Sequence, residues 1–340
     1  MSFFMSSMSD LKPYCGLPFF SLRLTSEGLV YLCCFQKGDK PVGNLLEQSL
    51  DEIWTSELVE SVRHDILKGK LHSLCKSAGG CPFRTSESHP PAEQPAEMRL
   101  LKLEIGLPNS HCNIGGHRPN AEQPACLMCE RSLEGYRFEE NRLKTILPKI
   151  KPWISSIDTI HVQGVAEPFW HDAIFDVLEQ IDYSSQIERA RLTTCTNGIL
   201  LTSEKRKRFF ASSKKSSLAI SIDAATASTY KKIRRLDAFE RVCENAIAFG
   251  RERNPELNQF QLQHNINLLN LHEVGEMVRF GKEANADAVE FNPTGGHPPE
   301  ILVNPSNRHL FQEAEEEIMI ASKKYNQPVT LLRPLTYLDE

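Results

Sequence analysis

The sequence predicts an α/β fold in which parallel strands alternate with helices and form an open, partial barrel. From about residue 97 onward, six short apolar runs are separated by longer segments with helical periodicity. A repeated strand-then-helix order is typical of a parallel sheet with right-handed crossovers. Six strands are too few for a closed eight-stranded barrel, so a partial (β/α)6 barrel fits the count.

The expected barrel strands cover residues 100–105, 159–162, 190–194, 218–222, 260–263 and 288–291. Helical periodicity is clearest at 169–181 and 273–284. In parallel α/β folds, the loops after the carboxyl ends of the strands build the active site, because strand ends and helix N-termini converge there. The residues directly after each strand are therefore the candidates for function.

A small α+β domain is expected before the barrel. Residues 85–97 contain Pro90, Pro91 and Pro95 and have the composition of a linker, which divides the chain into domains at 1–96 and 97–340. In the first domain we expect a β-hairpin with its turn at Ser26-Glu27-Gly28. One amphipathic helix is expected to follow, with the apolar residues Leu50, Ile53, Trp54 and Leu58.

Charge and hydropathy exclude some classes of partner. The formal charge of −5 and the pI of about 6.2 give no overall attraction to nucleic acid or anionic lipid. The basic run at 205–208 is expected to be a solvated helix face. We identify no signal peptide and no apolar stretch near the roughly 20 residues of a membrane span, so a cytoplasmic location is expected.

In that reducing compartment, clustered cysteines indicate metal ligation or catalysis rather than disulfides. Cys112 follows the first barrel strand, and after thirteen intervening residues Cys126 and Cys129 form a Cys-x-x-Cys pair. Three thiolates can hold a four-iron cluster and leave its fourth iron open for a chelating cosubstrate. The alternatives are a zinc site completed by His111 or His117, or inert buried thiols.

The loops after the next strands carry motifs that occur together in one superfamily. Residues 163–168 (QGVAEP) resemble a Gly-Gly-Glu-Pro loop in which Ala166 replaces the second glycine, and residues 196–198 form a Thr-Asn-Gly turn. At the fourth strand, a Ser-x-Asp element is followed by Tyr230 and Arg234 in a Tyr-x-x-x-Arg element. Over residues 98–293, the chain resembles the radical S-adenosylmethionine superfamily. Most of that family uses Cys-x-x-x-Cys-x-x-Cys, which is expanded here by residues 113–125.

This resemblance implies an enzyme, an oxidoreductase in the broad sense, with a [4Fe-4S] cluster on Cys112, Cys126 and Cys129. It implies that S-adenosylmethionine binds the open iron and is cleaved reductively to a 5′-deoxyadenosyl radical, which abstracts a substrate hydrogen. The family's motifs assign the methionine end to Gly164, Ala166 and Glu167. They assign the ribose or carboxylate to Asn197, Ser221, Asp223 and Arg234.

The N-terminal segment resembles the SPASM extension of these enzymes, including its Gly-Asn and Glu-Ile-Trp stretches. By that resemblance, an auxiliary [4Fe-4S] cluster would be held by Cys15, Cys33, Cys75 and Cys81. Cys34 is next to Cys33 on a strand and points to the opposite face, so at most one of the two reaches a cluster without distortion. The extension usually follows the barrel, whereas here it precedes it. A zinc-stapled mini-domain is the alternative.

The expected partners are S-adenosylmethionine, an electron donor such as flavodoxin or ferredoxin, and a small-molecule or peptide substrate. Oxidation, epimerisation and bond formation remain open as reactions. Cys195 is expected to be a buried thiol rather than a substrate contact, and His297 to be a surface loop residue. The alternative function is a non-catalytic zinc- or iron–sulfur-binding scaffold on the same fold.

Overall fold

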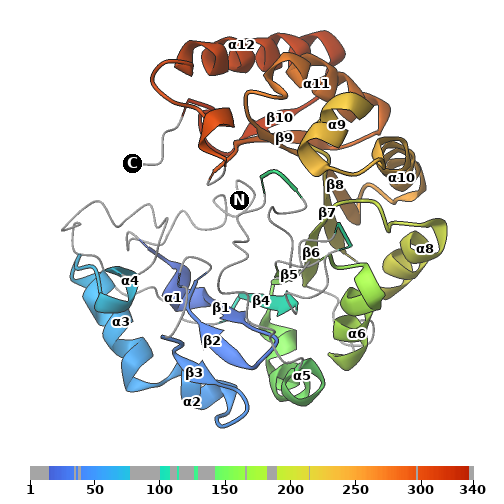
Figure 1. Ribbon diagram of the computed structural model, residues 1–340. Coiled ribbons are helices and arrows are strands. Elements are labelled where there is room, and N and C mark those ends of the chain that lie inside the picture. The colour runs from blue at the N-terminus through green and yellow to red at the C-terminus, as the bar shows by residue number, and fades with distance from the viewer. Residues whose placement is uncertain are drawn as a thin grey trace, which may run out of the picture. The chain divides into compact units, whose positions relative to one another are not determined.

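Figure 1 traces the fold in a computed structural model of the chain. The structure describes residues 15–33, 36, 40–76, 100–107, 113–114, 126–128, 142–164, 167–181, 190–213, 215–295 and 298–336. The chain divides into two compact units, which are described separately. The first combines Met1–Pro108, Glu139–Val165 and Ile174–Leu192, and the second combines Asn109–Phe138, Ala166–Ala173 and Thr193–Glu340.

The first unit begins with a β-hairpin. After α1 (Leu17–Phe20), β1 (Ser21–Leu24) pairs antiparallel with β2 (Leu29–Tyr31), which pairs in turn with β3 (Gly43–Asn44). Gly28 has a φ of 96°, a conformation that side chains other than glycine adopt only under strain, and its N–H donates to the Thr25 carbonyl. The predicted hairpin and its turn are therefore confirmed.

The prediction of a single amphipathic helix over 50–58 is wrong, because the segment forms α2 (Leu50–Trp54) and α3 (Glu57–Leu67). Ser49 and Glu52 form a capping box at the start of α2, and the Ser56 hydroxyl accepts from the N–H of Val59 to cap α3. The second cap starts a new helix, and Leu58 is consequently 39% exposed. The short α4 (Ser73–Lys76) follows.

Two barrel strands extend this hairpin into a mixed sheet. β4 (Lys102–Leu107) pairs parallel with β1 and with β5 (Thr159–Gly164), which gives the order β3-β2-β1-β4-β5. Between β4 and β5 lie α5 (Leu143–Ile150) and the 3₁₀ helix η2 (Lys151–Ser156), and α6 (Ala173–Gln180) follows β5. The predicted linker lies outside the described residues, and the domain boundary remains a prediction.

The second unit holds a parallel sheet built from strand–helix repeats. Its strands run in the order β6 (Arg191–Thr196), β7 (Ser216–Ser221), β8 (Asn258–Ile266), β9 (Ala288–Pro293) and β10 (Val329–Leu331). The connecting helices are η3 (Trp170–Asp172), α8 (Ser203–Ser212), α9 (Ala227–Arg234), α10 (Phe239–Glu252), η4 (Leu271–Glu273), α11 (Val274–Glu283), η5 (Pro299–Ile301) and α12 (Arg308–Tyr325). All six predicted barrel strands are confirmed as strands, and β10 is an addition. None of the helices in the described ranges is apolar over enough length to cross a membrane.

Helices cover one face of this sheet. Figure 1 shows α10, α11 and α12 on the same side of β8, β9 and β10. The ring of Phe260 on β8 lies 5.1 Å from that of Phe249 on α10, and Gly281 on α11 lies directly against the Val289 side chain on β9. The side chains of β8 that share a face with Phe260 therefore form part of the apolar core.

The basic run on α8 is not simply a solvated face, which corrects the sequence-based expectation. Arg206 is 6% exposed and donates two hydrogen bonds to the Glu252 carboxylate on α10, at 2.8 and 2.9 Å. It also donates to the Leu201 carbonyl at 2.8 Å. Lys207, the next residue, is exposed as predicted. The bidentate pair fastens α8 to α10.

Because Arg206 is buried and Lys207 is exposed, we expect the same substitution to affect stability differently at the two positions. We expect Arg206→Met to lower the free energy of unfolding by about 2 kcal/mol, because the Leu201 carbonyl loses its buried donor and Glu252 loses its partner. We expect Lys207→Met to change it by less than about 0.5 kcal/mol. Urea unfolding under anaerobic conditions measures both. Equal effects would show that the Arg206 contacts contribute nothing beyond a surface charge.

Candidate functional site

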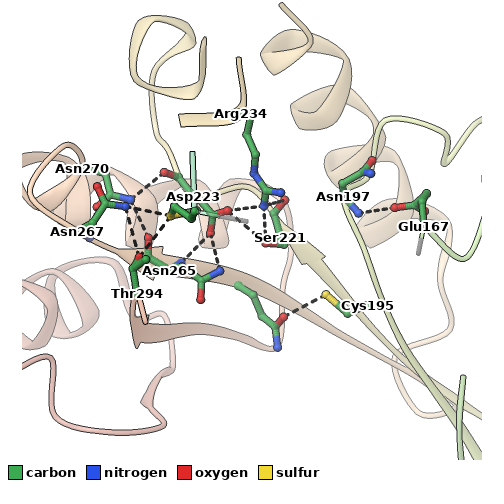
Figure 2. A network of polar contacts seen from close by, with 12 residues as sticks. Glu167, Cys195, Asn197, Ser221, Asp223, Arg234, Asn265, Asn267, Asn270 and Thr294 are labelled. Carbon is green, nitrogen blue, oxygen red and sulfur yellow. Dashed lines mark hydrogen bonds and ion pairs between the residues drawn. The ribbon is translucent and has the colours of Figure 1, made fainter. Parts of the chain in front are cut away.

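Three of the predicted cosubstrate residues meet at the carboxyl end of β7 (Figure 2). Ser221 is the last residue of the strand, Asp223 lies in the loop that follows, and Arg234 is the last residue of α9. A strand, a short loop and a helix of eight residues thus bring a hydroxyl, a carboxylate and a guanidinium together. These three residues form the first part of the candidate site in the second unit.

Arg234 and Asp223 form a buried ion pair. Nη2 of Arg234 donates to Oδ2 of Asp223, to Oγ of Ser221 at 2.6 Å and to the Ser221 carbonyl at 3.2 Å. The Asp223 side chain is fully buried and that of Arg234 is 12% exposed. Burial by itself would lower the pKa of Arg234, but the charges of Asp223 and Cys126 raise it above its usual value. The guanidinium therefore stays charged and lies within electrostatic reach of a predicted cluster ligand.

The second oxygen of Asp223 is held by the end of β8. Oδ1 accepts from the backbone N–H of Asn265 at 2.7 Å and from its side-chain amide at 3.3 Å. The side chain of Asn270 donates to the Asp223 carbonyl at 2.9 Å. Asp223 has a φ of 61°, in the left-handed region that aspartate tolerates better than most residues. These contacts hold a strained backbone and fix the direction of the carboxylate.

Glu273 fixes the loop between Asp223 and α9. Its carboxylate accepts from the N–H of Ala225 at 2.7 Å and from the hydroxyls of Thr226 and Thr229 at 2.6 Å each. Thr226 is the N-cap of α9, and a negative charge near a helix N-terminus is favourable. Because α9 ends at Arg234, Glu273 also determines where the guanidinium lies.

The predicted Glu167 and Asn197 form a second buried network (Figure 2). The Glu167 carboxylate accepts from the N–H of Asn197 at 2.8 Å, from the Thr196 hydroxyl at 2.5 Å and from the N–H of Phe169 at 3.2 Å. Burial raises the pKa of Glu167, and these three donors oppose that rise. Gly198 has a φ of 76°, and a side chain there would meet Ile220. Glu167 thus ties its own loop to the Thr-Asn-Gly turn.

Residues next to the predicted cluster cysteines contact both networks. The N–H of Leu127 donates to the Ile233 carbonyl at 2.8 Å, one residue before Arg234. The sulfur of Met128 accepts from Asn267 at 3.0 Å and from Thr294 at 3.3 Å. Asn113, which follows Cys112, accepts from the side chain of Asn197 at 2.7 Å. Both ends of the expanded cysteine loop are therefore attached to the strand ends that carry the predicted cosubstrate residues.

Several predicted ligands lie outside the described residues, namely Cys81, Cys112, Cys129 and Ala166, as does His297. Of the other predicted ligands, Cys126 is a half-buried thiol in the second unit, and Cys15, Cys33 and Cys75 are half-buried thiols in the first. Gly164 is the last residue of β5 and pairs with Leu107. Thiols are the donors that iron–sulfur clusters require, so this donor set fits such a cofactor.

The asparagines and Glu273 that support these networks were not among the predicted site residues. Asn265, Asn267 and Asn270 lie at and just after the end of β8, and Thr294 follows β9. The sequence did contain a signal for the asparagines, since three of them within six residues after a strand-like run are unusual for a buried crossover. Their partners are nevertheless distant in sequence, and no spacing rule connects Asn270 to Asp223 or Thr294 to Met128.

Comparison with known proteins gives an independent view of both parts of the chain. Residues 15–82 match the SPASM family model, described as an iron-sulfur cluster-binding domain. The predicted SPASM-like segment N-terminal to the barrel is therefore confirmed. No curated protein sequence matches the chain.

Solved structures match about two thirds of the chain. Streptococcus suis SuiB bound to S-adenosylmethionine has a TM-score of 0.50 and 14% identity, covering 69% of this chain and 51% of that one. The structure of anSMEcpe with bound AdoMet and a peptide also has a TM-score of 0.50, with 15% identity over 68% of this chain and 63% of that one. At these identities the likeness shows the fold alone, and it agrees with the predicted α/β partial barrel. The chain spans about half the length of SuiB.

The buried ion pair predicts a stability difference. We expect Asp223→Asn to lower the free energy of unfolding by about 3 kcal/mol, because the Arg234 charge would remain largely buried without its partner. The matched control is Asp237→Asn, whose ion pair with Lys231 is mostly exposed and is expected to contribute less than about 0.5 kcal/mol. Anaerobic chemical denaturation compares the two. A loss at Asp223 no larger than at Asp237 would contradict the assigned ion pair.

Proposed function

We propose that the chain is a radical S-adenosylmethionine enzyme with two [4Fe-4S] clusters. The observation that carries the proposal is the attachment of the cysteine loop to the strand ends. Between Cys126 and Cys129, the backbone of Leu127 contacts α9, which carries Arg234, and the sulfur of Met128 contacts Asn267 after β8. A cofactor on Cys112, Cys126 and Cys129 would therefore lie next to the predicted cosubstrate residues.

The residues of the second unit supply binding and orientation. Arg234 offers a permanent positive charge beside the cysteine loop, and the buried Asp223 and Ser221 hold that charge in one direction. Asn197, oriented by the Glu167 network, presents an amide beside Asn113 at the start of the same loop. Gly164, Ala166 and Glu167 are assigned to the methionine end. When bound, the reduced cluster would supply the electron that cleaves S-adenosylmethionine and gives the 5′-deoxyadenosyl radical.

The auxiliary cluster is assigned to Cys15, Cys33, Cys75 and Cys81, and the SPASM match over 15–82 supports this set. A reduced flavodoxin or ferredoxin is proposed as the electron donor. The substrate is proposed to be a peptide or a small molecule. The peptide bound to anSMEcpe supports the first of these two classes.

The experiment that tests the activity is anaerobic reconstitution with iron and sulfide, followed by dithionite and S-adenosylmethionine. We expect the wild-type chain to release 5′-deoxyadenosine and Cys126→Ala to release none, because two thiolates cannot hold the open cluster. Cys243→Ala, a half-buried cysteine on α10, is the matched control and should retain activity. Zinc in place of iron, with no 5′-deoxyadenosine from the wild type, would favour a non-catalytic scaffold instead.

The auxiliary cluster has its own test in a pair of adjacent cysteines. We expect Cys33→Ala to lower the iron content of the reconstituted chain from about eight to about four per chain, because one four-iron cluster loses a ligand. Cys33 lies beyond the end of β2 at Tyr31, which corrects the expectation that it is on a strand. Cys34→Ala should leave the iron content at about eight, because the resemblance to the SPASM extension assigns the ligand to Cys33. Iron analysis and electron paramagnetic resonance of the reduced proteins measure both. Equal iron loss in the two variants would overturn the choice of Cys33.

A further inference from the structure

Helix α9 presents basic side chains to solvent along one side. Lys231 and Lys232 lie in its last turn, Arg235 is its C-cap residue, and all three are exposed. Lys231 and Arg235 are four positions apart, so they lie on the same side of the helix with Lys232 beside them. Tyr230 and Ile233, on the other side, are buried. We call Lys231, Lys232 and Arg235 the basic patch.

The end of α9 that carries the basic patch also holds the cysteine loop. The N–H of Leu127 donates to the Ile233 carbonyl at 2.8 Å, two residues before Arg235. With standard bond lengths, this hydrogen bond keeps the Cα of Arg235 within about 13 Å of the Cα of Cys126. The basic patch is therefore the solvent side of a segment that supports the predicted cluster loop.

The other segments that hydrogen-bond to the described residues of the cysteine loop carry no basic group. Asn197 binds Asn113, and Asn267 and Thr294 bind Met128. No lysine or arginine occurs within three residues of Asn197, Asn267 or Thr294. Of these described attachments, the end of α9 is therefore the one that combines contact with the loop and exposed positive charge.

The charge of the basic patch is only partly compensated. Asp237 pairs with Lys231 at 3.2 Å, but both side chains are mostly exposed and such a pair is weak. Arg234 adds nothing to the patch, because the buried Asp223 compensates its charge. The chain as a whole has a formal charge of −5. Local positive charge on an acidic protein attracts an acidic partner to one place and steers its encounter.

Leu236 adds an exposed apolar side chain directly after the basic patch. It is 36% exposed and lies between the exposed charges of Arg235 and Asp237. Glu240 and Arg241, further along, are exposed and opposite in sign, so together they leave the local charge positive. An apolar centre with a charged rim is the usual anatomy of a protein interface, and electron-transfer partners form the smaller ones.

We propose that the basic patch and Leu236 form the docking surface for an acidic flavodoxin. This inference rests on the proposed function, because a cluster that cleaves S-adenosylmethionine must first be reduced. One electron passes from the flavin hydroquinone to the oxidised cluster, so the carrier is oxidised and the cluster reduced by one electron each. Electron transfer slows steeply with distance, which favours docking beside the cysteine loop. The apolar dimethylbenzene edge of a flavin suits contact with Leu236, and acidic residues around it suit the basic patch.

The experiment reverses the charge of two adjacent lysines at two places. Lys231→Glu/Lys232→Glu changes the last turn of α9. Lys323→Glu/Lys324→Glu is the matched control, since these lysines are exposed in the last turn of α12. α12 ends shortly before β10 starts, at the opposite edge of the sheet from the carboxyl ends of the parallel strands.

Binding and activity are measured on the reconstituted full chains. Isothermal titration calorimetry with flavodoxin gives the Kd at low and high salt. Release of 5′-deoxyadenosine is followed with dithionite and, separately, with flavodoxin reduced by NADPH and flavodoxin reductase.

We expect the α9 variant to raise the Kd about tenfold at low salt and to lower the flavodoxin-driven rate about fivefold at subsaturating flavodoxin. Its dithionite-driven rate should stay within about twofold of wild type, because dithionite needs no docking surface, and the α12 variant should stay within about twofold in every measurement. High salt should weaken wild-type binding toward that of the α9 variant, because salt screens exposed charges.

Three results would overturn the proposal: the same Kd for flavodoxin in wild type and the α9 variant, an equal loss in the α12 variant, or binding and reduction by ferredoxin but not by flavodoxin. If the double variant does not take up its clusters, Lys232→Glu is compared with Lys323→Glu. Flavodoxin binding is measured without turnover. A wild-type chain that binds flavodoxin through the patch but releases no 5′-deoxyadenosine with dithionite would therefore refute the proposed function and leave the docking surface standing.

Discussion

The buried ion pair between Asp223 and Arg234 is the interaction on which the candidate site depends. A guanidinium that is almost fully out of water is stable only beside a carboxylate, and that carboxylate requires further donors of its own. Asn265 supplies them from the end of β8, and Ser221 accepts the remaining hydrogen of the same guanidinium nitrogen. The pair therefore joins β7, α9 and β8 at one point.

Asparagine side chains connect the strand ends to the cysteine loop. Asn197 reaches Asn113, and Asn267 reaches Met128, so the two ends of the loop are held by different strand ends. Carboxamides suit this task because each donates and accepts without adding charge to a site that already contains a buried ion pair. Glu167 and Glu273 support these residues indirectly. Glu167 accepts from the backbone N–H of Asn197, and Glu273 accepts from the backbone of the loop before α9, which carries Arg234.

Amide side chains also line the face of β8 opposite Phe260 and His264. Between Ser221 and Glu290 the side chains are amides, a thiol and small residues, and Glu290 is the one carboxylate among them in the described part of that face.

The sequence by itself determined the six strand–helix repeats, the N-terminal hairpin and the motif residues after each strand, because periodicity and turn chemistry are local properties. It failed at Thr55 and Ser56, where a second helix cap interrupts an apolar pattern that looked continuous, and at Arg206, whose partner on α10 lies 46 positions away. Only the tertiary structure decided that Asn270, Glu273 and Thr294 support the site and that Gln263 lies beside Glu290. Those contacts arise because parallel strands bring residues from successive repeats to the same edge and face of the sheet, and such pairings leave no regular spacing in the chain.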